Sequence, residues 1–218
     1  MRTGYIIGID EVGRGPLAGP VTVAALLLTN NMRRKVLNSK FKLKDSKKLS
    51  QKQREEWVKF IKIHKIPYVI CSISPKIIDR INISQSANLA ATKTLKKLTL
   101  QLTTKQIHKL TFFLDGGLRL QKNLFMDSKF YFLNSRTIIR GDEKIPAISL
   151  ASIIAKVHRD NYMKKMDKKY PGYYFHKHKG YGTKLHYQMI KKHGISKIHR
   201  KSFLKNNAKQ IKHRMILH

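Results

Sequence analysis

The sequence has few cysteines and no long apolar runs. Cys71 is the single cysteine among 218 residues, so neither an intramolecular disulfide nor a cysteine-based zinc site can form. We expect it to be a buried thiol on a strand of a reduced, intracellular protein. No stretch reaches the roughly 18 apolar residues that a membrane span requires, and the N-terminus lacks the pattern of a secretory leader. These absences predict a cytoplasmic protein with no membrane partner.

Acidic residues are also scarce. Asp and Glu number 12 against 46 Lys and Arg, which gives a formal net charge of +34. A surface of that sign attracts polyanions and makes binding to nucleic acid depend strongly on salt. The lysines are spread along the whole chain, so a general compositional bias toward lysine is an alternative explanation. The charge favours nucleic acid as the partner but indicates no chemistry.

No repeat, low-complexity segment or Pro- and Gly-rich linker divides the chain. A chain of this length can bury a core of its own, and we expect one compact unit: a main domain at residues 1–160 with a basic C-terminal region, 161–218, packed on it. From residue 161 onward sixteen Lys and Arg accompany one acid, Asp167. We expect this region to lie along a nucleic acid backbone, while residues 199–218 are consistent with either a partner-binding tail or a packed helix.

Apolar patterns predict strands first, then strands that alternate with helices. Runs of strand length occupy residues 5–9, 21–28, 68–73, 110–114 and 137–139. Ser50 and Gln53 form a capping-box pattern before an amphipathic helix, and helices are also expected over residues 84–98 and from about Ser149, just after Pro146. The first two runs favour an antiparallel pair. The order predicts an α/β fold with a mixed central β-sheet flanked by helices.

Four of the acids stand at or just beyond strand ends: Asp10, Glu11, Asp115 and Asp142. Strand ends are where an open α/β sheet presents its ligands, and carboxylate oxygens suit Mg²⁺ and Mn²⁺. A regular strand would point Asp10 and Glu11 to opposite faces, so we expect a backbone turn at residues 12–13 to let both reach one metal site. Taken alone, each acid reads as a surface charge, or for Asp142 as a charge at a helix N-terminus. Together they favour a metal site.

The residues around these acids resemble the signature of bacterial ribonuclease HII. The first match is GIDEVGRGPLAGPV at residues 8–21. Further matches follow in the family's order at residues 45–50, 114–116, 141–142, 145–149, 151–157, 170–173, 178–183 and 199–203. These segments cover nearly the whole chain and are specific as a set, whereas a lone Asp-Glu or Asp-Gly pair would mean little.

The resemblance implies a ribonuclease H-like fold with a helical C-terminal extension, and makes residues 1–160 the catalytic domain. It implies an endonuclease that cleaves the RNA strand of RNA–DNA hybrids and cuts 5′ of single ribonucleotides in duplex DNA, and we expect this protein to be a monomer. The implied reaction is two-metal-ion hydrolysis with Mg²⁺ or Mn²⁺, two ions per active site, leaving 3′-hydroxyl and 5′-phosphate ends. Asp10, Glu11, Asp115 and Asp142 match the family's metal-binding carboxylates, with Asp10 bridging both ions.

Other residues of the matching segments suggest substrate contacts. Gly13, Arg14 and Gly15 match the loop that follows the ribonucleotide, where glycines let the backbone approach the 2′-OH. Tyr181 matches the tyrosine that stacks on the sugar 3′ to that ribonucleotide. Lys47 could hold a phosphate, with a solvated loop as an equal alternative. Without the resemblance, a Gly-x-Gly turn with an arginine would be a weak signal.

The aromatic and histidine residues near Tyr181 carry less weight. Tyr173 and Phe175 read almost equally well as apolar anchors of a loop and as stacking residues. His178 and His186 could move protons, but among ten histidines we expect both to be surface residues.

The segment 117–134 is longer than the resemblance suggests, and we expect it to form a surface loop or hairpin. Its length makes Asp127 a second candidate for the fourth metal ligand. We choose Asp142 because it leads into the matching segment 145–149.

Three other interpretations compete with this one. A noncatalytic basic nucleic-acid-binding protein would explain the charge but not four acids at strand ends. Ribonuclease HIII shares the fold and the acids but carries an extra N-terminal substrate-binding domain, which we do not expect here because Asp10 lies close to the start of the sequence. The third is an inactive homologue, although no catalytic position is lost.

Overall fold

The computed structural model describes residues 4–41, 43, 46–121 and 134–206, and its centre is a five-stranded sheet. The strands in chain order are β1 (Tyr5–Val12), β2 (Val21–Thr29), β3 (Tyr68–Ile73), β4 (Leu110–Asp115) and β5 (Asn134–Ile138). Their order across the sheet is β3-β2-β1-β4-β5. β1, β2 and β3 pair antiparallel, while β4 joins β1 and β5 joins β4 in parallel. The predicted mixed sheet and its antiparallel start are confirmed.

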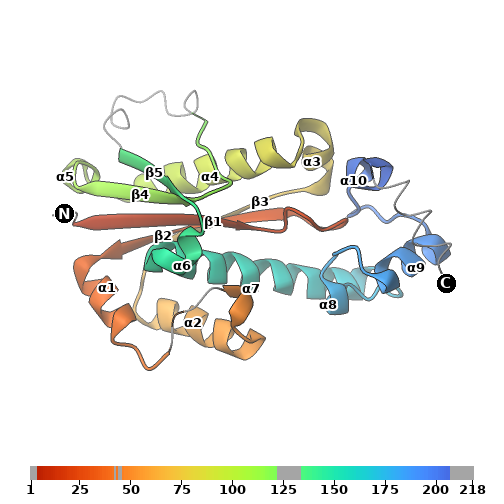
Figure 1. Ribbon diagram of the computed structural model, residues 1–218, viewed down its shortest axis with the longest axis horizontal. Helices are drawn as coiled ribbons and strands as arrows, with labels where there is room; N and C mark the ends of the chain where they lie inside the picture. Colours follow the sequence, from red (N-terminus) through yellow and green to blue (C-terminus); the bar gives the residue numbers. More distant parts are fainter. Residues whose placement is uncertain (1–3, 42, 44–45, 122–133, 207–218) are drawn as a thin grey trace.

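Helices cover both faces of this sheet. They are α1 (Asn30–Leu37), the 3-10 turn η1 (Ser46–Lys48), α2 (Gln51–Ile63), α3 (Pro75–Ile81), α4 (Ile83–Thr99), α5 (Thr104–Ile107), α6 (Gly141–Lys144), α7 (Pro146–Lys169), α8 (Phe175–His178), α9 (Lys184–His193) and α10 (Lys201–Asn206). Figure 1 shows α4 on one side of β1 and α7 with α2 on the other. Residues 21–28 of β2 are all buried, as expected for a strand covered on both faces.

Alternation along the strands divides the core into two layers. Ile7 and Ile9 of β1 face α4, where Ala87, Ala91 and Leu95 line up at helical spacing. On the opposite face, residues of β2 and α7 form a second layer that includes Trp57 and Ile61 of α2. The predicted helix over residues 84–98 is thus confirmed as α4. Burial of its small residues lets the helix lie close to the sheet.

Several predicted boundaries differ from the structure. α7 begins at Pro146 rather than near Ser149, because proline fits the first helical position, where its missing N–H is not needed. β5 begins earlier than expected and leaves out Ile139, which is 76% exposed. Cys71 lies on β3 as predicted but is half-buried rather than buried. Asp127 and most of the segment 117–134 lie outside the described residues.

The C-terminal elements gather at the end of α7, beyond the sheet. Figure 1 shows α8, α9 and α10 at this end, with α3 nearby. Asp79 of α3 accepts hydrogen bonds from the amides of Lys201 and Ser202, at 3.0 and 2.9 Å, at the start of α10. Ala18 and His199 form an isolated antiparallel bridge. These contacts fix the C-terminal elements to α3 and to the loop between β1 and β2. In the described part of the chain, no helix is long and apolar enough to cross a membrane.

Candidate active site

Asp10 and Glu11 lie near the end of β1, and the strand stays paired past both of them. The ladder with β2 continues to Val12. The backbone turns only at Gly13, whose φ is +90°. The turn expected at residues 12–13 therefore comes after the two acids. The end of the neighbouring strand β4, and not this turn, explains how the acids come together.

β1 and β4 run parallel, with Ile9 beside Leu114, so Asp115 as the last residue of β4 lies next to Asp10. The ladder between β1 and β4 ends with the pair Ile9 and Leu114, and Glu11 lies beyond the end of β4. One oxygen from each of the three carboxylates lies within 4.8 Å of the other two. We call Asp10, Glu11 and Asp115 the acid cluster.

The acid cluster is crowded, with Asp10 buried and Glu11 and Asp115 partly buried. Asp10 is 5% exposed, and its Oδ1 accepts a 2.7 Å hydrogen bond from the Glu11 amide. Burial raises the pKa of Asp10 well above its usual range, and the negative charge of Glu11 adds to the rise. Burial also raises the pKa of Glu11, while the Arg14 guanidinium acts in the opposite direction. A site that holds several carboxylates so close together favours a bound cation.

One oxygen of the acid cluster lacks a hydrogen-bond donor. Glu11 Oε1 accepts a 3.0 Å bond from Arg14 Nη1, but Glu11 Oε2 is buried and has no partner within the described residues. An unsatisfied buried polar atom costs about 1–3 kcal/mol, and more when it is charged. A divalent cation would remove this cost. Three converging carboxylates with an unpartnered oxygen therefore fit a hard ion such as Mg²⁺ or Mn²⁺.

Asp142 lies beside the acid cluster. It is in the first turn of α6, directly after the amide of Gly141, which donates a 2.8 Å hydrogen bond to Asp115 Oδ1. Among the described residues, the carboxylate oxygens that meet belong to Asp10, Glu11 and Asp115 alone. Asp142 as a fourth ligand stays a prediction.

Arg14 connects the acid cluster to the loop that follows β1. Besides its bond to Glu11, Nη1 donates to the carbonyl of Gly117 at 3.1 Å, and Nη2 donates to Ser84 Oγ at 3.2 Å. A β-carbon on Gly117 would lie 2.8 Å from Arg14 Nη1, so a side chain at this position would push the Arg14 guanidinium away. Gly15 is exposed, with open space where a side chain would be. The loop thus turns the Arg14 side chain toward the acids and leaves its main chain accessible at Gly15.

Two buried arginines hold this loop, and sequence reasoning assigned neither of them a role. Arg159 of α7 and Arg200 are both 0% exposed. Each guanidinium donates three hydrogen bonds of 2.6–3.0 Å to main-chain carbonyls. The acceptors are the carbonyls of Gly13, Arg14, Ala18, Gly19, Pro20 and Lys179. An arginine in a basic sequence reads as exposed; the one available signal was that Arg200 falls in the matching segment 199–203.

Tyr181 lies against the same loop. The amides of Leu17 and Ala18 donate to the Gly180 carbonyl at 2.8 and 3.3 Å. The Arg159 guanidinium lies 5.9 Å from the centre of the Tyr181 ring. Tyr181 is 41% exposed, so part of its ring is available to a ligand.

The expectation that His178 and His186 are surface residues is wrong. His178 is 8% exposed and His186 is 0% exposed, because their rings pack against each other and against Phe175. Tyr173 and Phe175 are buried beside them, with parallel rings 5.2 Å apart. Their burial favours the apolar-anchor interpretation of Tyr173 and Phe175 over stacking on a ligand.

Lys47 lies in η1, which packs on α7 close to Asp10. Ser46 Oγ is 2.8 Å from Ser152 Oγ, and a hydrogen bond from Ser152 acts to lower the pKa of Asp10. Lys47 itself is exposed. Its position near the acid cluster is compatible with a phosphate contact, which stays a prediction.

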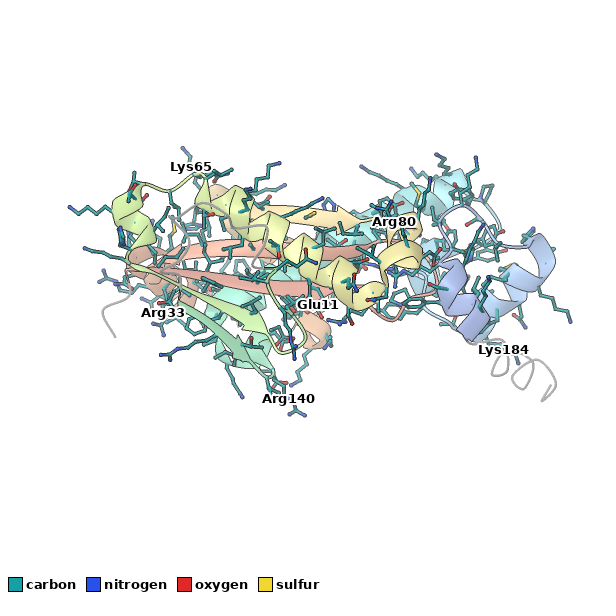
Figure 2. All side chains as sticks on the ribbon, turned by 90° about the horizontal axis from the view of Figure 1, so that it is seen from above. Glu11, Arg33, Lys65, Arg80, Arg140 and Lys184 are labelled. Atoms are coloured by element: carbon teal, nitrogen blue, oxygen red, sulfur yellow. The ribbon has the colours of Figure 1, made fainter. Side chains whose placement is uncertain are left out.

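Basic side chains lie on several sides of the acid cluster (Figure 2). Figure 2 shows Glu11 near the middle of the molecule, with Arg33 and Lys184 toward opposite ends and Arg80 and Arg140 on opposite sides of it. A polyanion approaching the acid cluster from several directions would therefore meet positive charge.

Comparison with known proteins identifies close relatives. The family model described as Ribonuclease HII matches residues 7–206. The chain is 43% identical over 200 residues to Ribonuclease HII of Francisella tularensis subsp. holarctica (strain FTNF002-00 / FTA), covering 91% of this chain and 94% of that protein. It is 40% identical over 202 residues to Ribonuclease HII of Caldicellulosiruptor bescii, covering 93% and 87%.

Solved structures share the fold. Ribonuclease H2 from Pyrococcus horikoshii OT3 superposes with a TM-score of 0.72 at 24% identity, covering 98% of this chain and 100% of that one. The PCNA:RNase HII complex from Archaeoglobus fulgidus gives a TM-score of 0.67 at 26% identity, covering 95% and 96%. The predicted ribonuclease H-like fold is confirmed.

Proposed function

The chain belongs to the ribonuclease HII family, and from this premise we propose that it cuts 5′ of single ribonucleotides embedded in duplex DNA as well as within RNA–DNA hybrids. Membership of the family makes it a ribonuclease H, a hydrolase of the phosphodiester bond. The proposal adds the substrate range and the 3′-hydroxyl and 5′-phosphate ends of the products. The observation that carries it is the acid cluster beside a loop with accessible main chain.

Asp10, Glu11 and Asp115, with Asp142 as a fourth ligand, are proposed to hold two divalent ions, Mg²⁺ or Mn²⁺. Such ions supply an activated water and neutralise charge on the leaving oxygen. The chain fixes the orientation of its carboxylates through main-chain amides, from Glu11 to Asp10 and from Gly141 to Asp115. Oriented ligands of this kind are typical of metal sites.

The substrate contacts are proposed to come from the loop after β1 and from the turn at residues 179–181, which Arg159 joins. The main chain of Gly13, Arg14 and Gly15 is proposed to hydrogen-bond the ribonucleotide 2′-OH, and Tyr181 is proposed to stack on the next sugar. Arg159 bonds carbonyls of both loops, Ala18 and Pro20 in one and Lys179 in the other, which supports a fixed spacing between the two contacts. Lys47 and the basic region 161–218 are proposed to bind phosphates of the duplex.

The test is cleavage of a DNA duplex that contains one ribonucleotide, in the presence of Mg²⁺ or Mn²⁺. We expect the parent to cut 5′ of the ribonucleotide and the Asp10→Asn variant to be inactive. Glu55→Gln is the matched control, because Glu55 pairs with Gln51 on the outer face of α2 and its loss should leave activity intact. Tight binding without cleavage by the parent would instead support the noncatalytic interpretation.

A further inference from the structure

Three buried histidines pack together next to the main chain of Tyr181, and we call them the histidine cluster beneath Tyr181. They are His178 at the end of α8, His186 in α9 and His199 before α10, with 8%, 0% and 3% of their surfaces exposed. The rings of His178 and His186 stack with their centres 4.2 Å apart, and those of His186 and His199 are 5.1 Å apart. Within the described residues they are not part of a group of metal-ligating atoms, so their hydrogen bonds are the guide to their role.

Fixed donors and acceptors of the main chain assign the protons of these rings. The Ser196 amide donates to His199 Nδ1 at 2.8 Å, so neutral His199 carries its proton on Nε2. That proton faces His186 Nε2 at 3.0 Å. His186 Nε2 must then accept, which leaves the His186 proton on Nδ1, 3.0 Å from the Tyr181 carbonyl. The chain of hydrogen bonds therefore runs from Ser196 to Tyr181.

His178 makes a similar contact with the main chain of Gly180, the residue before Tyr181. Its Nδ1 accepts a 3.1 Å bond from the Gly180 amide, and its Nε2 donates a 2.9 Å bond to the Tyr173 carbonyl. Every ring nitrogen of the three histidines thus has a partner when all three rings are neutral. Burial lowers the pKa of His186 to about 3 and that of His199 to about 4, which agrees with neutral rings.

The backbone at Lys179 and Gly180 adopts a conformation that needs support from surrounding contacts. Lys179 and Gly180 have φ values of +52° and +85°. A left-handed conformation is unfavourable for a residue such as lysine and persists only when surrounding contacts fix it. A β-carbon on Gly180 would lie 2.3 Å from the Ala18 carbonyl oxygen, so the turn is pressed against the loop after β1. The hydrogen bond from the Gly180 amide to His178 and the one between His186 and the Tyr181 carbonyl are contacts that can hold this turn.

We propose that His186 is a positioning residue, and that its Nδ1–H bond to the Tyr181 carbonyl sets the place of the Tyr181 ring at the ribonucleotide–deoxyribonucleotide junction. His199 fixes the tautomer of His186, and His178 holds Gly180. The proposal rests on the proposed function of Tyr181. Loss of the bond should weaken cleavage at single ribonucleotides more than cleavage of uniform hybrids, which offer no such junction.

Two substitutions of His186 distinguish the loss of its positioning role from a general loss of stability. In His186→Asn the side-chain amide takes the place of Nδ1 and retains the donor to Tyr181, while in His186→Gln it takes the place of Nε2 and loses that donor. Both remove the ring and should destabilise the fold similarly. The measurement is the ratio of kcat/KM on a single-ribonucleotide duplex to kcat/KM on a uniform RNA–DNA hybrid. We expect the ratio to be unchanged in His186→Asn and about fivefold lower in His186→Gln.

Equal ratios in the two variants would overturn the proposal. Tyr181→Ala serves as the reference: if it lowers the ratio and His186→Gln does not, the positioning role alone is wrong. If Tyr181→Ala leaves the ratio unchanged, the junction role of Tyr181 is wrong and the positioning role falls with it.

A second measurement needs no variant. The ¹⁵N chemical shifts of the imidazoles in the parent protein distinguish the two neutral tautomers. We expect His186 to carry its proton on Nδ1 and His178 and His199 to carry theirs on Nε2 at neutral pH. A His186 ring with its proton on Nε2, or one that is charged at neutral pH, would contradict the proposal even if the variants fail to fold.

Discussion

The acid cluster and the histidine cluster beneath Tyr181 are both buried and polar, but they differ in how well their polar atoms are satisfied. In the acid cluster, carboxylates crowd together and Glu11 Oε2 has no hydrogen-bond partner among the described residues. Beneath Tyr181, each ring nitrogen of His178, His186 and His199 has one. An unsatisfied polar cluster is suited to bind a ligand, whereas a satisfied one is suited to hold its neighbours in place.

The largest expected effect comes from the unsatisfied cluster. Asp10→Asn should lower kcat/KM by more than about 100-fold, because loss of a metal ligand should cost at least as much as loss of a residue that only orients a ligand. The measurement is steady-state cleavage of an RNA–DNA hybrid with Mg²⁺ or Mn²⁺. Activity close to that of the parent would remove Asp10 from the metal site.

Arg200, a buried residue whose guanidinium is hydrogen-bonded to main-chain carbonyls, should affect stability. Arg200→Met is expected to lower the free energy of unfolding by about 3 kcal/mol, because it leaves buried carbonyls such as those of Gly13 and Gly19 without donors. Arg200→Lys should recover little, since an ammonium group lacks the planar fork. Urea unfolding measures both, and exposed Arg33→Met is the control, expected within about 0.5 kcal/mol of the parent. A loss equal to that control would show that the loop does not depend on Arg200.

Tyr181 should affect selectivity rather than folding. Tyr181→Ala is expected to lower cleavage of the single-ribonucleotide duplex about tenfold relative to the uniform hybrid, which corresponds to the loss of one stacking contact. Tyr181→Phe keeps the ring and should keep the preference. Equal losses on both substrates in competition assays would argue against a contact at the junction.

Lys47 should give the smallest effect. Lys47→Ala is expected to weaken binding of the duplex about threefold and to reduce the salt dependence of binding by about one ion, as for one phosphate contact. Lys105→Ala on α5, an exposed lysine away from the acid cluster, is the control for loss of one charge. Fluorescence anisotropy across a salt series provides both values, and identical slopes for the two variants would remove Lys47 from the interface.

The same contrast explains what could be predicted from the sequence. β1, β2 and α4 follow from local apolar patterns, and the acids at the ends of β1 and β4 stand out because acids are rare in this chain. The burial of His186 and Arg200 could not be predicted in this way. Both sit in a Lys- and His-rich stretch that reads as solvent-exposed, and the Arg200 contacts join it to a loop up to 187 residues away in sequence.

The metal-free acid cluster should be a source of instability. Because burial raises the pKa of Asp10 in the folded protein, ionising it costs stability, so the free energy of unfolding should fall as the pH rises from the usual 3.8 through the raised pKa. Asp10→Asn removes that cost. A divalent ion that binds the folded parent restores stability by mass action.

The most direct test is therefore thermal unfolding of the parent and Asp10→Asn near neutral pH, each in EDTA and in Mn²⁺. We expect the order to reverse: Asp10→Asn has the higher Tm in EDTA, and the parent has the higher Tm with Mn²⁺. The same order in both conditions, with no response of the parent to Mn²⁺, would contradict a metal site at the acid cluster.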